Sequence, residues 1–163
     1  MNFQKKSYAK LALGSPGDIL KGYHNNCSTW WGYTADANVK AGGFVQTKAN
    51  PTNENEIIGA SGKAITGTIL GVATKNTFIS SCNEATTTFP QNNNVEYLSV
   101  GTIVVGAESQ VAKKGQYVFL KNDTGAIAFD DNATKSGYTL TKFRVLIGNS
   151  KTEAGVVAIT TDL

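Results

Sequence analysis

The sequence predicts an all-β protein, and three observations support that prediction. Only 17% of the 163 residues are charged while glycine fills 17 positions, a balance that favours strands and turns over surface helices. Short β-rich runs recur along the chain with turn residues between them. No stretch places apolar residues at helical spacing between capping residues. We therefore expect an antiparallel β-sandwich or barrel.

Residues 95–129 contain three β-rich runs, which predict a β-meander at the centre of the fold. The first run, VEYLSVGTIVV, carries apolar side chains on both faces and predicts one central strand that is buried on both sides. The second run, 116–120, repeats this pattern. Residues 122–125 (Asn-Asp-Thr-Gly) tolerate the positive φ of a tight hairpin turn, with Gly125 in that conformation, and the third run follows the turn.

Further strands are expected on both sides of this segment. They are FVQT at 44–47, a short pairing at 56–60, the run 65–73, an alternating run from Lys142 to Ile147, and 156–160. Gly67 and Gly71 within 65–73 predict a bulge or a close backbone approach. Residues 50–55 and 76–94 are polar and irregular, and we expect loops there, the second ordered by contacts.

Residues 1–40 differ from the rest, because glycine and proline interrupt every apolar run. We expect an extended N-terminal arm over 1–40 and a single β-sandwich domain over 41–163. The arm is dense in aromatic residues and contains both tryptophans of the chain, which is not typical of a disordered tail. It either wraps its own domain or binds a partner surface, since Trp and Tyr are favoured at interfaces. The candidate partner-binding residues are Tyr8, Tyr23, Trp30, Trp31 and Tyr33.

Composition argues against nucleic-acid and membrane partners. The net charge is only +3, and Arg144 is the single arginine, whereas nucleic-acid readers cluster arginines for paired contacts. No run approaches the roughly 20 apolar residues of a membrane span, and the N-terminus lacks a signal-peptide core. Synthesis in the cytoplasm and two free thiols, Cys27 and Cys82, are the expectation.

The sequence predicts no enzyme, cofactor or metal site. The only histidine, His24, lies three residues before Cys27 in the glycine-rich arm, where a catalytic pair would lack a rigid scaffold. Three Cys and His residues in total are a poor supply for zinc. Asp130-Asp131-Asn132 lacks the rest of a calcium loop, and phosphate-binding glycine motifs are absent.

The strand and turn phrases of the chain nevertheless resemble a known family. The phrases are ITGTILGVA (65–73), YLSVGTIVV (97–105), VAKKGQYVFLKNDTGAIAF (111–129), KFRVLIGN (142–149) and GVVAITT near the end. Their order resembles the structural cement proteins of tailed phages, which decorate capsids. The resemblance covers residues 41–163. It implies a jelly-roll-like β-sandwich with an extended N-terminal arm.

The resemblance also implies a function. Such a protein sits on the outer capsid surface of the virion as a homodimer or homotrimer, binds the major capsid protein, and bridges and stabilises neighbouring copies of it. Two alternatives remain open. One is a carbohydrate-binding or receptor-binding β-sandwich that stacks sugars on Trp30, Trp31, Tyr33 or Tyr138, and the other is a tail or baseplate subunit.

Overall fold

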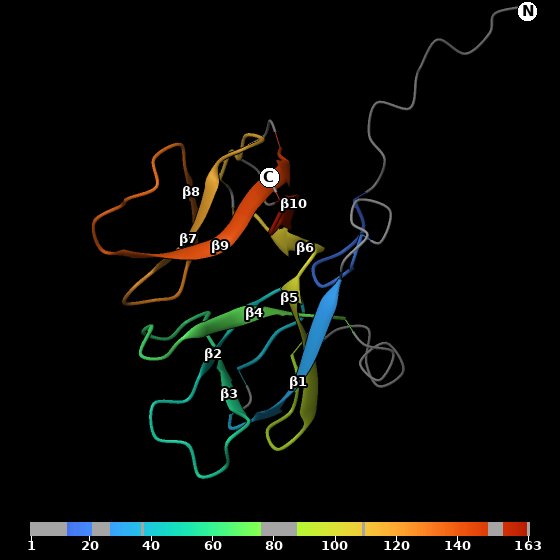
Figure 1. The fold of residues 1–163 in the computed structure, drawn as a ribbon, viewed down its shortest axis with the longest axis vertical. Coiled ribbons are helices and arrows are strands. Elements are labelled where there is room, and N and C mark those ends of the chain that lie inside the picture. Colours follow the sequence, from blue (N-terminus) through green and yellow to red (C-terminus); the bar gives the residue numbers. More distant parts are fainter. Residues whose placement is uncertain are drawn as a thin grey trace, which may run out of the picture.

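The computed structural model describes residues 13–20, 27–36, 38–75, 88–108, 110–149 and 155–162, and within them it contains strands but no helix. In chain order the strands are β1 (Ser28–Thr34), β2 (Phe44–Thr47), β3 (Glu56–Gly59), β4 (Ile69–Ala73), β5 (Asn94–Val100), β6 (Thr102–Gly106), β7 (Tyr117–Lys121), β8 (Ile127–Asp130), β9 (Tyr138–Ile147) and β10 (Val156–Thr160). The first five form a closed barrel and the last five a separate sheet (Figure 1). The all-β prediction is confirmed.

The barrel has the strand order β1-β3-β2-β4-β5 and is closed by antiparallel pairing of β1 with β5. β1 and β3 run parallel, while the other neighbours are antiparallel. The glycine prediction for this region is confirmed, because a Cβ on Gly71 would lie 2.1 Å from the carbonyl oxygen of Leu98, and one on Gly67 would lie 2.1 Å from that of Thr47. Only glycine permits backbones to approach this closely.

The second sheet has the order β6-β10-β9-β7-β8. β7 and β8 form the predicted hairpin, in which the Gly125 N–H donates to the Lys121 carbonyl at 2.7 Å and the Lys121 N–H donates to the Ala126 carbonyl at 2.8 Å. Gly125 has a φ of 62°, as predicted. Strands β2 and β10 also match their expected bounds.

The predicted central strand is wrong in one respect. Residues 95–105 form two strands, β5 in the barrel and β6 in the sheet, separated by Gly101 with a φ of 129°. This left-handed residue turns the chain from one sheet into the other, so Leu98 and Ile103 reach the same core despite their odd spacing. β6 pairs with β10 and not with β7, so the predicted meander across 95–129 is also wrong.

The prediction of an extended arm over all of 1–40 is corrected as well. β1 lies within that range and pairs with β5 from Ser28 to Tyr33. Residues 17–20 run beside β6, where the Gly17 N–H donates to the Val104 carbonyl at 2.9 Å and the Val104 N–H donates to the Asp18 carbonyl at 3.0 Å. Residues 1–12 lie outside the described residues.

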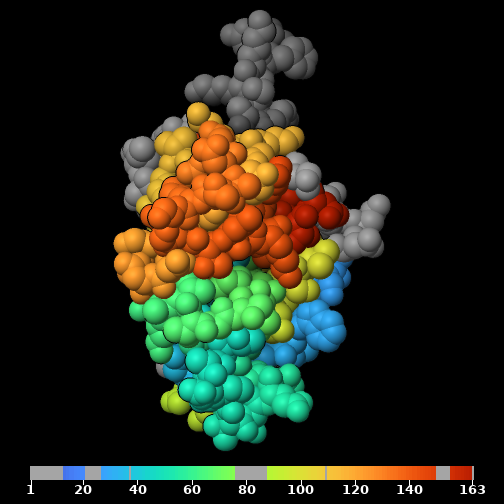
Figure 2. Space-filling model, turned by 60° about the vertical axis from the view of Figure 1, so that its left-hand side comes forward, coloured from blue at the N-terminus to red at the C-terminus, as the bar shows by residue number. Residues whose placement is uncertain are grey.

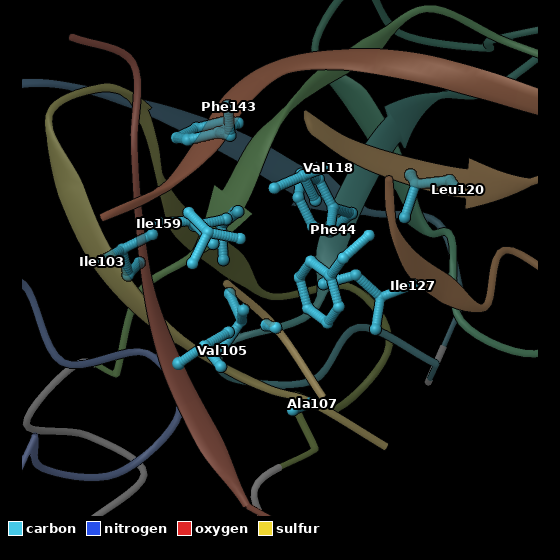
Figure 3. Close-up of a cluster of buried hydrophobic side chains, with 14 of the residues drawn as sticks. Phe44, Ile103, Val105, Ala107, Val118, Leu120, Ile127, Phe143 and Ile159 are labelled. Atoms are coloured by element: carbon cyan, nitrogen blue, oxygen red, sulfur yellow. The ribbon is translucent and has the colours of Figure 1, made fainter. Parts of the chain in front are cut away.

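Two apolar clusters lie inside the molecule. The larger one, which we call the shared core, fills the space between barrel and sheet (Figure 3). Its buried members are Phe44, Ala60, Val72, Leu98, Ile103, Val105, Ala107, Ala112, Val118, Leu120, Ile127, Phe129, Phe143, Val145, Val157 and Ile159. The smaller one, the barrel core, consists of Val39, Ala41, Val45, Ile57, Ala73, Phe89 and Val95.

Barrel and sheet therefore pack as two layers around one apolar interior, and Figure 2 shows the orange and red sheet residues stacked on the blue to green barrel residues. The strands of the two layers do not interleave along the chain, since β1–β5 all belong to one and β6–β10 to the other. A jelly roll alternates its strands between two sheets. The jelly-roll detail of the predicted fold is therefore not borne out.

Candidate functional site

A surface pocket lies beside the exposed Trp31. Trp31 and Tyr33 lie two residues apart on β1 and therefore point to the same face of the strand. They border a shallow pocket of about 370 Å³, which we call the Trp31 pocket. Its lining residues are Trp31, Gly32, Tyr33, Asn53, Glu54, Asn55 and Asn94. The side chain of Trp31 is 59% exposed.

The loop that carries Asn53 and Asn55 is positioned by a largely buried carboxylate. Glu56 Oε2 accepts hydrogen bonds from the Thr52 N–H at 2.8 Å and from Lys48 Nζ at 3.0 Å. The hydrogen bond from the Thr52 N–H has the largest effect on the pKa of the Glu56 carboxyl, and the one from Lys48 the next largest. Both hold this pKa below its usual value. The Tyr33 N–H donates to the Asn55 carbonyl at 2.8 Å and thereby ties the loop to β1. The loop is thus set beside Trp31 before any ligand arrives.

The opposite rim, residues 90–94, is positioned by Thr34. The Thr34 hydroxyl donates to the Pro90 carbonyl at 2.8 Å and accepts from the Asn93 N–H at 2.9 Å. Asn92, in the left-handed conformation with a φ of 64°, turns the chain into β5. The register of β1 and β5 then sets Asn94 opposite Tyr33.

Trp30 does not belong to this pocket. It is 60% exposed, but it follows the alternation of β1 to the other face, opposite Tyr97 in register. Gly32 lies on the same face as Trp30, and a Cβ there would come within 2.7 Å of the Ile57 side chain in the barrel core. The two neighbouring tryptophans therefore serve two different surfaces.

The predicted site residues are brought together only in part. Trp31 and Tyr33 share the pocket and Trp30 does not, while Tyr8 and Tyr23 lie outside the described residues. Tyr138, the fourth ring of the carbohydrate hypothesis, lies on β9 in the other sheet, where Lys135 Nζ is 4.9 Å from its ring centre.

Sequence reasoning missed the amide side chains of the pocket. Asn53, Asn55 and Asn94 lie in stretches for which the sequence predicts only loops. Their asparagine-rich composition was the available signal, but it did not indicate that the two loops meet at β1.

Elsewhere in the described part of the chain, no three His, Cys, Asp or Glu side chains gather as a metal site would require. His24 and Cys82 lie outside the described residues. The Asp130 carboxylate accepts from the Asn132 N–H at 3.0 Å and from Lys135 Nζ at 3.3 Å, so it orders a turn, and the same two donors lower its pKa. Among the residues described, no helix is long and apolar enough to cross a membrane.

Comparison with known proteins identifies the family. No curated protein matches the sequence. A chain in the solved structure of the capsid of Myoviridae phage XM1 is similar in fold, with a TM-score of 0.63 over 99% of this chain and 98% of that chain at 15% identity. The family model described as structural cement protein (E217 gp24/Pam3 gp6) matches residues 3–161. Because this match spans nearly the whole sequence, the chain belongs to the phage structural cement protein family and has a structural role in the phage capsid.

Proposed function

We propose that this cement protein binds the outer surface of the phage head as a homodimer or homotrimer and bridges neighbouring copies of the major capsid protein. The family match supports a capsid role and extends over the N-terminal segment, the barrel and the sheet. Cementing requires contact area, on the order of 800 Å² per partner for a stable interface, and a body that transmits load between contacts.

The observation that carries the proposal is the way residues 13–20 are fastened. The segment bonds to β6 on one side, and on the other the Lys75 N–H, just after β4, donates to the Gly17 carbonyl at 2.9 Å. The Ser15 N–H donates to Asp18 Oδ2 at 2.7 Å and closes a turn, and Lys75 Nζ donates to the Ser15 hydroxyl at 3.1 Å. Force on the residues before this segment is therefore shared by the barrel and the sheet.

Within this proposal, the partner contacts come from residues 1–12, Tyr23 and Trp30. Trp30 exposes a large ring away from the Trp31 pocket. Burying such a ring against a partner contributes up to about 3 kcal/mol. Many identical copies act on one head, so a modest affinity per copy is enough for firm reinforcement.

The test adds purified protein to heads that lack it and measures sedimentation with the heads and the temperature of head rupture. Wild-type protein is expected to bind and to raise that temperature. A variant lacking residues 2–12 is expected to keep its melting temperature as free protein and to bind more weakly, as is Trp30→Ala. A longer deletion through residue 33 is unsuitable, because it removes most of β1 from the barrel.

Light scattering of the free protein tests the oligomer, with two or three times 17.2 kDa as the expected mass. Failure of the wild-type protein to bind or to stabilise heads would overturn the proposed bridging. Binding of the truncated form at wild-type strength would show that residues 2–12 make no contact with the capsid.

A further inference from the structure

We propose that the Trp31 pocket binds a neutral saccharide. Its aromatic part is suited to the apolar face of a sugar ring. Trp31 and Tyr33 stand on one face of β1, about 7 Å apart along the strand. A pyranose has one face lined by C–H groups, which packs flat on an aromatic ring and removes apolar area from water. A ring that is 59% exposed in the free protein is available for such stacking.

The rim of the pocket is suited to sugar hydroxyls. Each of Asn53, Asn55 and Asn94 carries a side-chain amide with a carbonyl acceptor and two N–H donors. These three side chains are exposed, while the backbones that carry them are held by the hydrogen bonds from the Glu56 N–H to the Asn53 carbonyl and from the Tyr33 N–H to the Asn55 carbonyl, and by the pairing of Asn94 with Tyr33. Neighbouring hydroxyls on a sugar both donate and accept, so an amide pairs with two of them at once.

The charge of the lining selects against acidic ligands. Glu54 is the charged residue of the lining, and neither lysine nor arginine is among the lining residues. A phosphate or a sialic acid carboxylate would therefore meet a like charge with no cation to offset it. A neutral or N-acetylated sugar can hydrogen-bond to the three asparagine amides and to the Glu54 carboxylate, and it can pack against the two aromatic rings. The volume of about 370 Å³ lies at the small end of ligand pockets, which suits one or two sugar rings.

The two rims are built before binding, which lowers the ordering cost of the complex. The Glu56 carboxylate sets one rim through Thr52, and the Thr34 hydroxyl sets the other through Pro90 and Asn93. The proposal does not depend on capsid bridging, because Trp30 and residues 13–20 lie outside the pocket lining. It can therefore be tested on the free protein.

The test uses the fact that the chain contains two tryptophans. In Trp30→Phe, Trp31 is the only tryptophan, so its emission reports on the pocket. This variant is titrated with cellotetraose, maltotetraose and N-acetylated chitotetraose, and with sialyllactose as an acidic comparison. We expect a saturable emission change with at least one neutral sugar, and none with sialyllactose. The matched variant Trp31→Phe retains Trp30 alone and is expected to show no change.

Calorimetry with the best sugar then measures affinity in the full-length protein. Trp31→Ala is expected to bind at least 10-fold more weakly, and Asn53→Ala about 5-fold. Leu140→Ala removes an apolar side chain that is 44% exposed on the other sheet, and it is expected to bind like the wild type. Asn53 is exposed in a loop, so its variant should melt at the wild-type temperature.

Three results would overturn the proposal. The first is the lack of a saturable response to any of the three neutral sugars. The second is an equal response in Trp31→Phe, which would place binding elsewhere. The third is a preference for sialyllactose, which would contradict the selection by charge.

Discussion

The shared core and the barrel core hold the molecule together by different means. The shared core gathers sixteen buried apolar residues from both layers, and an edge-to-face pair of Phe44 and Phe143, with ring centres 5.8 Å apart, joins β2 to β9. The barrel core has seven buried members, of which Phe89 is the only aromatic residue. Around it, the barrel relies on buried polar side chains. These are Thr34, Gln46, Glu56, Thr74 and Ser99, whereas the sheet buries only the threonines Thr102, Thr141 and Thr160 among its described polar side chains.

This difference indicates a division of labour within one chain. Apolar packing is insensitive to direction and suits the interface between two layers. Buried hydrogen bonds fix the course of individual loops, because a buried hydrogen bond stops stabilising the fold when its geometry changes. The barrel therefore positions the rims of the Trp31 pocket, while the shared core supplies most of the stability.

Phe143→Ala should have the largest effect. The ring is fully buried in the shared core against Phe44, so its removal leaves a cavity and costs about 3–5 kcal/mol of unfolding free energy. Chemical denaturation followed by circular dichroism measures the loss. Lys142→Ala, at the exposed neighbouring position on β9, is the control and should change stability little. A loss below about 1 kcal/mol in Phe143→Ala would contradict the dominance of the shared core.

Gly125→Ala should have the second largest effect on stability, because the β7–β8 turn packs directly against the barrel. A Cβ at this position would overlap the Ala60 carbonyl oxygen, far inside van der Waals distance, and the φ of 62° is itself strained for alanine. We expect a loss of about 3 kcal/mol, against about 1 kcal/mol for Gly137→Ala. Gly137 has a φ of 78°, and a Cβ there would have no other heavy atom within 4 Å, so this variant reports backbone strain alone. Equal melting temperatures for the two variants would show that the close approach of Gly125 to the Ala60 carbonyl does not affect stability.

Gln46→Leu separates the two kinds of stabilisation. The Gln46 side chain accepts from the Thr66 and Gly67 N–H groups at 2.9 and 3.0 Å and donates to the Ala64 carbonyl at 3.0 Å. Leucine is similar in size and more apolar, but it leaves three backbone groups without their partner. We expect a loss of about 2 kcal/mol and faster hydrogen exchange at Thr66 and Gly67. A stabilised variant would indicate that the barrel also depends on apolar burial.

Glu56 should make the barrel sensitive to acid. Its pKa is lower in the folded protein than in the unfolded chain, because the Thr52 N–H and Lys48 favour the carboxylate. Its contribution is thus complete above the unfolded pKa and is lost as the pH falls through the folded pKa. Melting temperatures of wild type and Glu56→Gln should therefore converge from about pH 5 downward. Asp123 and Asp130, whose pKa values are also lowered, are common to both proteins and cancel in the difference. A constant gap between the two curves would show that the Glu56 carboxylate does not titrate differently on folding.

The local features of this protein can be predicted from its sequence. Composition and short β-rich runs between turn residues indicated the all-β class and the positions of β2 and β10, and residues 122–125 predicted the β7–β8 hairpin with Gly125 at positive φ. Such features depend on a few neighbouring residues and on the conformations those residues tolerate. The strand and turn phrases that resemble the cement proteins likewise indicated the family. The match of the family model to residues 3–161 confirms it.

Tertiary structure alone decided which strands meet. It placed β5 and β6 in different layers at Gly101, inserted β1 between β3 and β5, and set β6 beside β10. It also joined Trp31 to asparagines that lie some twenty and sixty residues further along the chain, and it turned Trp30 away from them. The reason is that strand pairing is decided by the complete hydrogen-bond ladder and the core that a given arrangement buries. No short segment contains that information.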